Sequence, residues 1–231
     1  MLRTLYFMVG FTLVTIFFML TGLPLTLINP DYFHNYTFYW ARICLLMGGV
    51  HLQVVGGERV PLDRAVIYMP NHQGNFDIPA LYVGISRQFR WLAKMELFRV
   101  PLFGFCMRSI GHIPIDRTDR KEAIASLDEA ARRIAAGTSV IIFPEGTRSL
   151  DGRLQPFKKG GFTMAMQAGA VIVPVAISGS AEVMAKSGYR VRGGSIRLEL
   201  LPPIETVRID DRSVLMEKVR ASIAQALESV R

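Results

Sequence analysis

Cysteine is scarce in this sequence, which has only Cys44 and Cys106 among its 231 residues. Both lie in apolar segments, and neither has a neighbour in the sequence that would activate its thiol as a nucleophile. Two isolated cysteines exclude a disulfide framework, and they indicate that the protein works in a reducing compartment.

Several other signatures are also missing. The sequence has no internal repeat, no low-complexity linker and no cluster of metal-ligand residues, so we expect neither a metal ion nor a bound cofactor. No recognition helix or RNA-binding motif accompanies the formal net charge of +8, which argues against nucleic acid as the partner. The charge therefore indicates other anions, such as phospholipid headgroups and phosphorylated small molecules.

The basic residues are scattered among apolar segments. For each of them taken singly, a solvated surface cation is the simpler interpretation. The candidates for a basic face are Arg132, Arg133, Lys158, Lys159, Lys186, Arg190 and Arg192.

The N-terminal region contains little charge. No charged residue lies between Leu5 and Ile28, and a helix over that run would be about 36 Å long, enough to cross a hydrocarbon core of roughly 30 Å. A second apolar stretch, residues 36–55, carries Arg42 and His51, so a two-helix element that enters one leaflet fits as well as a spanning helix. A cleaved signal peptide fits less well, because the run is too long and no Ala-x-Ala-like site follows it.

Either possibility predicts a membrane-associated N-terminal element over residues 1–55 and one further domain over residues 56–231. If the first helix spans the bilayer, Arg42, Arg59 and Arg64 outnumber Arg3 in the flanking segments. Because basic residues favour the cytoplasmic side, this excess places the second domain on the cytoplasmic side of a cell's inner membrane.

After residue 55, short apolar runs typical of strands alternate with helical periodicity. Asp119 and Glu122 form a capping pattern for a helix over residues 119–136, and Gly137 is its stop signal. The alternation predicts an α/β fold with a mostly parallel or mixed central sheet, flanked by helices, whose polar loops gather along one edge. The candidate strands are residues 52–55, 65–69, 90–93, 110–115, 139–143, 171–177 and 196–201.

The most informative polar loop contains His72 and Asp77, between a predicted strand that Pro70 ends and a helix that starts at or near Asp77. On a regular helix this spacing would turn the two side chains roughly 140° apart, so the loop must bend if they are to meet, and Gly74 makes the bend easy. An imidazole backed by a carboxylate is a general base. The pair alone is equally well explained by a capping aspartate beside an incidental histidine.

A second polar loop follows the predicted strand at 139–143. Glu145, Thr147 and Arg148 offer an acceptor, a hydroxyl and a bidentate guanidinium, a set suited to a polyol that bears a phosphate. A surface turn held by a Glu-Arg pair is the alternative. Between the two loops, Asp116 and Arg117 end another short strand, where Arg117 is suited to a phosphate and an ordinary ion pair is an equal explanation.

The four blocks at residues 71–77, 111–117, 143–149 and 173–177 resemble, in order and spacing, the motifs of the glycerolipid acyltransferases, specifically the bacterial 1-acyl-sn-glycerol-3-phosphate acyltransferase family. The resemblance covers about residues 50–205, and Lys94 begins a segment similar to the family's Lys-x-Glu-Leu element. The second motif departs from the family at Pro114, where an aromatic or aliphatic residue is usual.

The resemblance favours a membrane-anchoring helical hairpin over residues 1–55, and it implies that residues 56–231 form an acyltransferase catalytic domain. It implies transfer of a fatty acyl chain from acyl-ACP (acyl carrier protein) or acyl-CoA to the sn-2 hydroxyl of 1-acyl-sn-glycerol-3-phosphate (lysophosphatidic acid), which gives phosphatidic acid. The expected partners are these substrates and membrane phospholipids. By the same resemblance, His72 is the catalytic base and Asp77 supports it, and the substrate-binding residues are Lys94, Arg117, Glu145, Gly146, Thr147 and Arg148.

The chemistry agrees with these residue types. A thioester is already activated, so attack by a hydroxyl needs a base and stabilisation of the oxyanion but no covalent enzyme intermediate. Two alternatives remain, a different lysolipid acceptor such as a lyso-ornithine lipid and a non-catalytic membrane lipid-binding protein. We expect an acyl tunnel to be lined by residues from the apolar segment after Lys94, namely Phe98, Leu102, Phe103, Phe105 and Met107.

Overall fold

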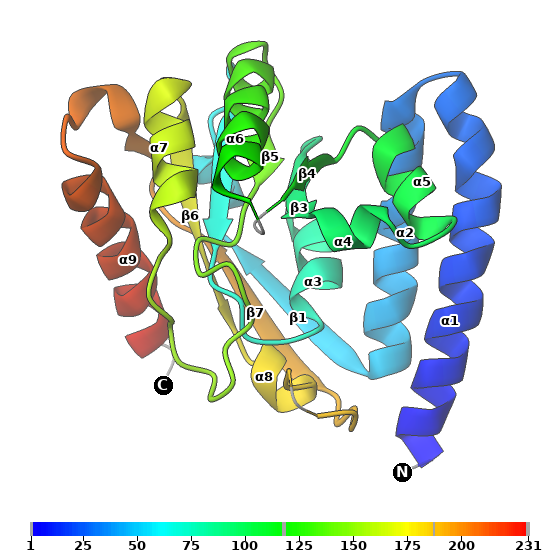
Figure 1. Cartoon of the computed structure of the whole chain (residues 1–231). Helices are drawn as coiled ribbons and strands as arrows, with labels where there is room; N and C mark the ends of the chain where they lie inside the picture. Colours follow the sequence, from blue (N-terminus) through cyan, green and yellow to red (C-terminus); the bar gives the residue numbers. More distant parts are fainter. Residues whose placement is uncertain (1, 117–118, 187, 230–231) are drawn as a thin grey trace.

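The computed structural model describes residues 2–116, 119–186 and 188–229. Within them, an eight-stranded sheet has the order β1-β7-β6-β2-β5-β3-β4, and β8 also pairs with β6 (Figure 1). Pairing is parallel except where β7 and β8 meet β6, which confirms the predicted α/β class with a mixed sheet. The strands are β1 Val50–Val55, β2 Val66–Pro70, β3 Arg90–Lys94, β4 Ile113–Ile115, β5 Val140–Ile141, β6 Val171–Ser178, β7 Gly194–Leu200 and β8 Ile204–Glu205.

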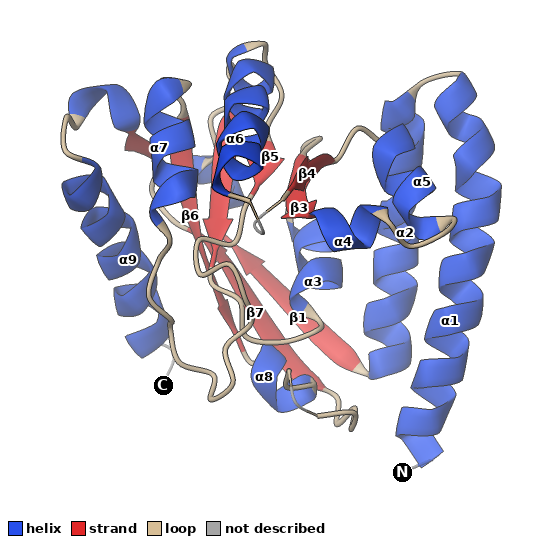
Figure 2. Ribbon diagram, viewed as in Figure 1, coloured by secondary structure: helices blue, strands red, loops and turns tan. Residues whose placement is uncertain are grey.

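Helices cover both faces of the sheet (Figure 2). The α-helices are α1 Leu2–Gly22, α2 Pro30–Gly48, α3 Asp77–Gly84, α4 Met95–Phe98, α5 Phe103–Ser109, α6 Arg120–Ala135, α7 Lys159–Gln167, α8 Ser180–Val183 and α9 Arg212–Glu228. Three 3₁₀ turns are described as well, η1 Leu23–Leu27, η2 Gly57–Arg59 and η3 Thr206–Arg208.

The alternation of side chains along the central strands creates two cores. In β2, Val66 and Tyr68 belong to the core shared with α1, α2 and α3, whereas Ile67 and Met69 belong to the core shared with α6, α7 and α9. All four side chains are fully buried. This period of two is what a strand covered on both faces requires.

The predicted helix over residues 119–136 is confirmed as α6. Asp119 is its N-cap, and Oδ1 of that side chain accepts hydrogen bonds from the backbone N–H groups of Lys121 at 2.7 Å and Glu122 at 3.0 Å. The strand predicted at residues 110–115 is shorter than expected, because α5 continues to Ser109 and β4 begins only at Ile113.

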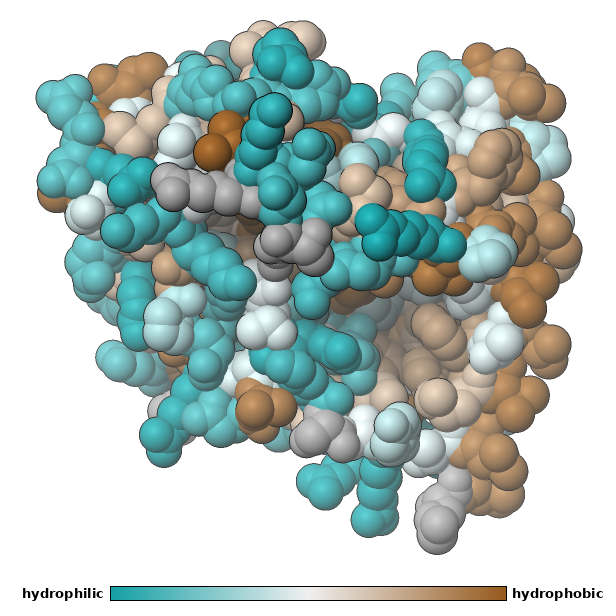
Figure 3. Space-filling model, in the orientation of Figure 1, coloured by the Kyte–Doolittle hydropathy of each residue, from teal (hydrophilic) through white to brown (hydrophobic). Residues whose placement is uncertain are grey.

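The two N-terminal helices run side by side along one flank of the molecule (Figure 1). Leu2–Leu27 has a mean hydropathy of 2.0 and is long and apolar enough to cross a membrane by length and composition. Only 11% of the apolar 18-residue window within this segment is buried, so the helix differs from a core helix. Its apolar side chains form the brown edge of the surface in Figure 3. The sequence division at residue 55 remains a prediction; β1, on its N-terminal side, pairs with β7 in the sheet.

Candidate active site

The loop between β2 and α3 brings the side chains of His72 and Asp77 into direct contact. Nδ1 of His72 lies 2.6 Å from Oδ2 of Asp77, and the same oxygen accepts hydrogen bonds from the backbone N–H groups of Gln73 at 2.8 Å and Gly74 at 3.0 Å. The Asp77 side chain is fully buried, and that of His72 is 14% exposed. The carboxylate therefore holds the imidazole proton on Nδ1, and Nε2 is the atom that can accept a proton.

Glu145 fixes the backbone of the same loop from the neighbouring strand end. Its Oε1 accepts a hydrogen bond from the His72 N–H at 2.7 Å, and its Oε2 accepts one from the Gln155 N–H at 3.0 Å. In return, the Ser149 N–H donates to the His72 carbonyl oxygen at 2.7 Å. Burial raises the pKa of Glu145 to about 7, against the lowering effect of those two backbone donors.

Phe143, the second residue after β5, begins the second polar loop and lies under the imidazole ring of His72. Its phenyl ring stacks on the His72 imidazole with centroids 3.7 Å apart and 11° between the planes. The Trp91 ring of β3 stacks on the Phe143 ring, with 5.8 Å between the ring centroids. No pattern in the sequence predicts a role for these two aromatic residues, because their contacts join β3 and the loop after β5 to the loop after β2.

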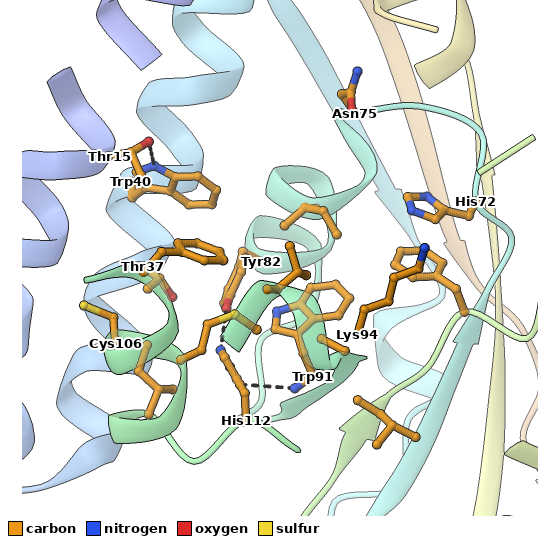
Figure 4. Close-up of a pocket in the computed structure, with 18 of the residues that line it drawn as sticks. Thr15, Thr37, Trp40, His72, Asn75, Tyr82, Trp91, Lys94, Cys106 and His112 are labelled. Carbon is orange, nitrogen blue, oxygen red and sulfur yellow. Dashed lines mark hydrogen bonds between the residues drawn. The ribbon is translucent and has the colours of Figure 1, made fainter. Parts of the chain in front are cut away.

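A cavity of about 560 Å³ opens beside His72. Figure 4 draws His72 and Lys94 at one end of it, and Thr37, Cys106 and His112 at the other. Most of its wall is apolar. The lining residues come from α1 and α2 (Thr15, Phe18, Met19, Phe33, Thr37, Trp40), from the sheet and α3 (His72, Gly74, Asn75, Ile78, Tyr82, Trp91, Leu92, Ala93, Lys94), from α4, α5 and their flanks (Leu97, Phe103, Cys106, Met107, Ile110, His112), and from later loops (Phe143, Gly146, Thr147, Arg148, Lys186).

The predicted tunnel residues are partly corrected by this arrangement. Phe103 and Met107 line the cavity, as expected. Phe98 is 1% exposed and faces the core of the protein, whereas Phe105 is 58% exposed. Leu102 packs with the cluster beneath α5. Within α5, Phe103 and Met107 lie on the face that meets the cavity, and Phe105 lies on another face.

Four of the predicted substrate-binding residues line the cavity, namely Lys94, Gly146, Thr147 and Arg148. The Arg148 guanidinium donates to Oδ1 of Asn75, and Gly146 has a φ of 71°, a left-handed turn that suits glycine. Glu145 does not line the cavity, because both of its oxygens face backbone amides. The predicted residue Arg117 lies outside the described residues.

His112 belongs to the far wall of the cavity, away from His72 (Figure 4). Its Nδ1 accepts a hydrogen bond from the Trp91 N–H at 3.2 Å, so Nε2 carries the proton and donates to the Tyr82 hydroxyl oxygen at 3.2 Å. Burial, followed by the nearby charges of His34 and Arg90, holds the pKa of His112 well below 6.5. A neutral His112 thus fixes Trp91, and Trp91 in turn supports Phe143.

The described part of the chain has no group of three or more His, Cys, Asp or Glu side chains that could hold a metal ion. The side chains around His72 are instead a base, an orienting carboxylate and several cations. Together they can remove a proton from a hydroxyl group and bind an anionic group close to it.

Comparisons with known proteins agree with one another. The family model described as Acyltransferase matches residues 51–178. The chain is 32% identical to the chloroplastic 1-acyl-sn-glycerol-3-phosphate acyltransferase BAT2 of Brassica napus, over 94% of this chain and 64% of that protein. It is 34% identical to the 1-acyl-sn-glycerol-3-phosphate acyltransferase of Limnanthes alba, over 86% of this chain and 72% of the relative.

The chain is shorter than many of these relatives, and it spans 52% of the length of the protein from Chlamydomonas reinhardtii. Over nearly its whole length it is similar to a solved structure. The crystal structure of the 1-acyl-sn-glycerophosphate (LPA) acyltransferase PlsC from Thermotoga maritima matches 99% of this chain and 95% of its own, with 25% identity and a TM-score of 0.86. The similarity therefore includes α1 and α2 as well as the sheet.

Proposed function

The chain belongs to the acyltransferase family, among the 1-acyl-sn-glycerol-3-phosphate acyltransferases, and we propose that it transfers a fatty acyl chain from acyl-ACP or acyl-CoA to the sn-2 hydroxyl of 1-acyl-sn-glycerol-3-phosphate. The product is phosphatidic acid, a precursor of membrane phospholipids. The observation that carries this proposal is the 2.6 Å contact between His72 and Asp77 at the mouth of an apolar cavity.

The reaction needs a single proton relay. Nε2 of His72 takes the proton from the acceptor hydroxyl while the hydroxyl oxygen attacks the thioester carbonyl carbon. The tetrahedral intermediate then expels the thiolate, which receives the proton from the imidazolium. Asp77 stabilises the imidazolium, and a positioned base of this kind contributes on the order of 10²- to 10⁴-fold to the rate.

The apolar cavity suits the acyl chain, and the cations at its mouth suit the phosphate. Lys94 lies at the same end of the cavity as His72 (Figure 4). Arg148 also lines the cavity, and the next residue, Ser149, donates its N–H to the His72 carbonyl oxygen. A phosphate held by these two cations would place the hydroxyl of the neighbouring glycerol carbon near Nε2. Guanidinium and ammonium groups form their strongest hydrogen bonds with such anions.

The membrane supplies the acceptor. The exposed apolar side chains of α1, among them Leu5, Leu13 and Phe17, would enter the bilayer, and the cavity wall formed by α1 and α2 would then face the lipid. We place the catalytic domain on the cytoplasmic side of the inner membrane, because Arg42, Arg59 and Arg64 flank the apolar segment on that side.

A reconstituted assay tests the proposal. Purified protein in phospholipid vesicles is given a labelled acyl-ACP or acyl-CoA and one lysolipid, and the diacyl product is measured. We expect phosphatidic acid from 1-acyl-sn-glycerol-3-phosphate, and a loss of at least 100-fold in His72→Ala. His51→Ala, an exposed histidine of β1, is the matched control and should keep full activity.

Three outcomes would change the conclusion. Product from a lyso-ornithine lipid alone would replace the acceptor. Substantial activity in His72→Ala would remove the base. Failure of folded wild-type protein with every lysolipid and both donors would favour a lipid-binding protein without catalytic activity.

A further inference from the structure

Lys186 is a cavity residue that lies outside the region matched by the family model, which ends at residue 178. Its sequence context alone indicates a solvated surface cation. In the structure it lines the same cavity as His72. Its Nζ donates to Oγ1 of Thr147 at 3.1 Å and to the carbonyl oxygen of Arg148 at 3.0 Å.

The segment that carries Lys186 is fixed against the catalytic loop. Ala185 forms an antiparallel bridge with Gly74, and the Asn75 N–H donates to the carbonyl oxygen of Met184 at 3.2 Å. A Cβ atom at Gly74 would lie 2.4 Å from the carbonyl oxygen of Ser180, so glycine permits this close approach. The position of Lys186 is therefore coupled to that of His72.

Lys94, Arg148 and Lys186 line this cavity, and they lack acidic partners in the part of the chain that the structure describes. Among the described residues, no carboxylate lies within ion-pair distance of Lys94, Arg148 or Lys186. The recorded side-chain partner of Arg148 is the neutral amide oxygen of Asn75. Uncompensated cations in a partly enclosed site favour an anionic ligand.

The ammonium group of Lys186 has capacity left for such a ligand. A lysine offers three N–H donors, and the two recorded contacts, with Thr147 and Arg148, use two of them on neutral acceptors. The side chain is partly buried, which reduces screening by solvent. One donor and the whole positive charge remain.

We propose that Lys186 determines specificity by binding the acceptor phosphate and selecting a phosphate monoester over a phosphodiester. The inference rests on the proposed function. A phosphate monoester carries a charge of about −1.5 to −2 at pH 7, whereas a phosphodiester carries a single negative charge. A third cation beside Lys94 and Arg148 matches the additional charge of the monoester.

Two acceptors that differ in this charge test the proposal. They are 1-acyl-sn-glycerol-3-phosphate and its methyl phosphodiester, each assayed with the same donor. In Lys186→Gln, a neutral amide replaces the ammonium group, so the side chain can still form hydrogen bonds but carries no charge. We expect kcat/KM for the monoester to fall about 10- to 100-fold, as for a lost charge-assisted hydrogen bond, mainly through KM. For the phosphodiester it should change little.

Two variants serve as controls. Lys186→Arg keeps the charge and should keep the preference for the monoester. Lys218→Gln removes an exposed lysine of α9, on the other side of the sheet from the cavity, and should change neither acceptor. If Lys186→Gln slows both acceptors equally, Lys186 only positions the Thr147 loop, and the proposal is overturned. The proposal is also overturned if Lys186→Gln leaves kcat/KM unchanged for both acceptors.

Binding without a donor separates this inference from the proposed function. The affinities of wild type and Lys186→Gln for the monoester and the phosphodiester are measured in mixed detergent micelles. In one outcome, the wild-type protein transfers no acyl chain but binds the monoester more tightly than the phosphodiester, and Lys186→Gln loses this preference. That outcome would overturn the proposed function and keep the role of Lys186. Equal affinities of the two proteins for the monoester would overturn the role of Lys186 alone.

Discussion

The imidazole of His72 lies flat on the phenyl ring of Phe143, with 3.7 Å between ring centroids and 11° between planes. Hydrogen bonding to Asp77 fixes one edge of the imidazole, but a single hydrogen bond leaves rotation about its axis. The stacked ring removes that freedom. Two contacts, one from the start of α3 and one from the loop after β5, therefore determine the direction of Nε2 together.

Replacing Phe143 with alanine should therefore impair orientation more than binding. We expect kcat to fall about 10- to 100-fold, the scale of a misplaced catalytic group, while KM for the acceptor changes less than threefold. Phe143→Tyr keeps a six-membered ring over His72 and is the matched control. Steady-state kinetics with both substrates varied give the two constants, and an alanine variant that loses only affinity would contradict the orienting role.

The Asp77→Asn substitution tests the tautomer of His72. An asparagine amide can present its N–H to Nδ1, which would move the imidazole proton to Nε2 and leave no base at the acceptor hydroxyl. We expect kcat to decrease by at least 100-fold. Circular dichroism and thermal unfolding should show a folded protein, and activity within tenfold of wild type would show that the carboxylate is dispensable.

Chain length should depend on one face of α5. Met107 lines the cavity, whereas Phe105, two residues away, is exposed. Met107→Trp fills part of the cavity, so kcat/KM for the longest acyl donors should fall about tenfold while short donors are little affected. Phe105→Trp is the control on the same helix. A series of acyl-CoA or acyl-ACP donors of increasing length measures the effect, and equal profiles for the two variants would place the acyl chain elsewhere.

The stability of the protein should carry a pH dependence that originates at Glu145. Burial raises the pKa of this carboxyl from 4.5 to about 7, so between these values the folded protein holds a proton that the unfolded chain has released. The contribution of Glu145 is therefore fully present below about pH 4.5 and is lost as the pH rises to 7, with a slope of up to about 1.4 kcal/mol per pH unit.

Urea unfolding at intervals from pH 5 to 8 measures this slope. The difference in unfolding free energy between pH 5 and 7 should be smaller in Glu145→Gln than in wild type. Glu217→Gln removes an exposed carboxyl of α9 and should reproduce the wild-type slope. Parallel curves for wild type and Glu145→Gln would show that the proton is bound elsewhere.

Local signals allowed much of this structure to be predicted. Asp119 caps α6 through amides two and three residues away, and the apolar runs that became strands are contiguous in the sequence. The bend that joins His72 to Asp77 is also local, because it needs only a short loop with Gly74 in it. Such features follow from neighbouring residues, and the sequence pattern records them directly.

Other features depend on which strands become neighbours. The contact of Lys186 with Thr147 spans 39 positions, and the stacking of Phe143 on His72 follows from the pairing of β2 with β5. Glu145 was expected at the substrate, but the order of the strands turns its carboxylate to the His72 amide. No periodicity or spacing within one segment encodes these relationships.

Phe18 of α1 and Phe33 and Trp40 of α2 line the same cavity as His72. Deleting these helices to make the protein water-soluble would remove one wall of the cavity and would let water reach a thioester bound there. Under the proposed function, the same two helices would both anchor the protein and enclose the acyl chain. A variant engineered for solubility would have to replace that wall of the cavity with new apolar residues.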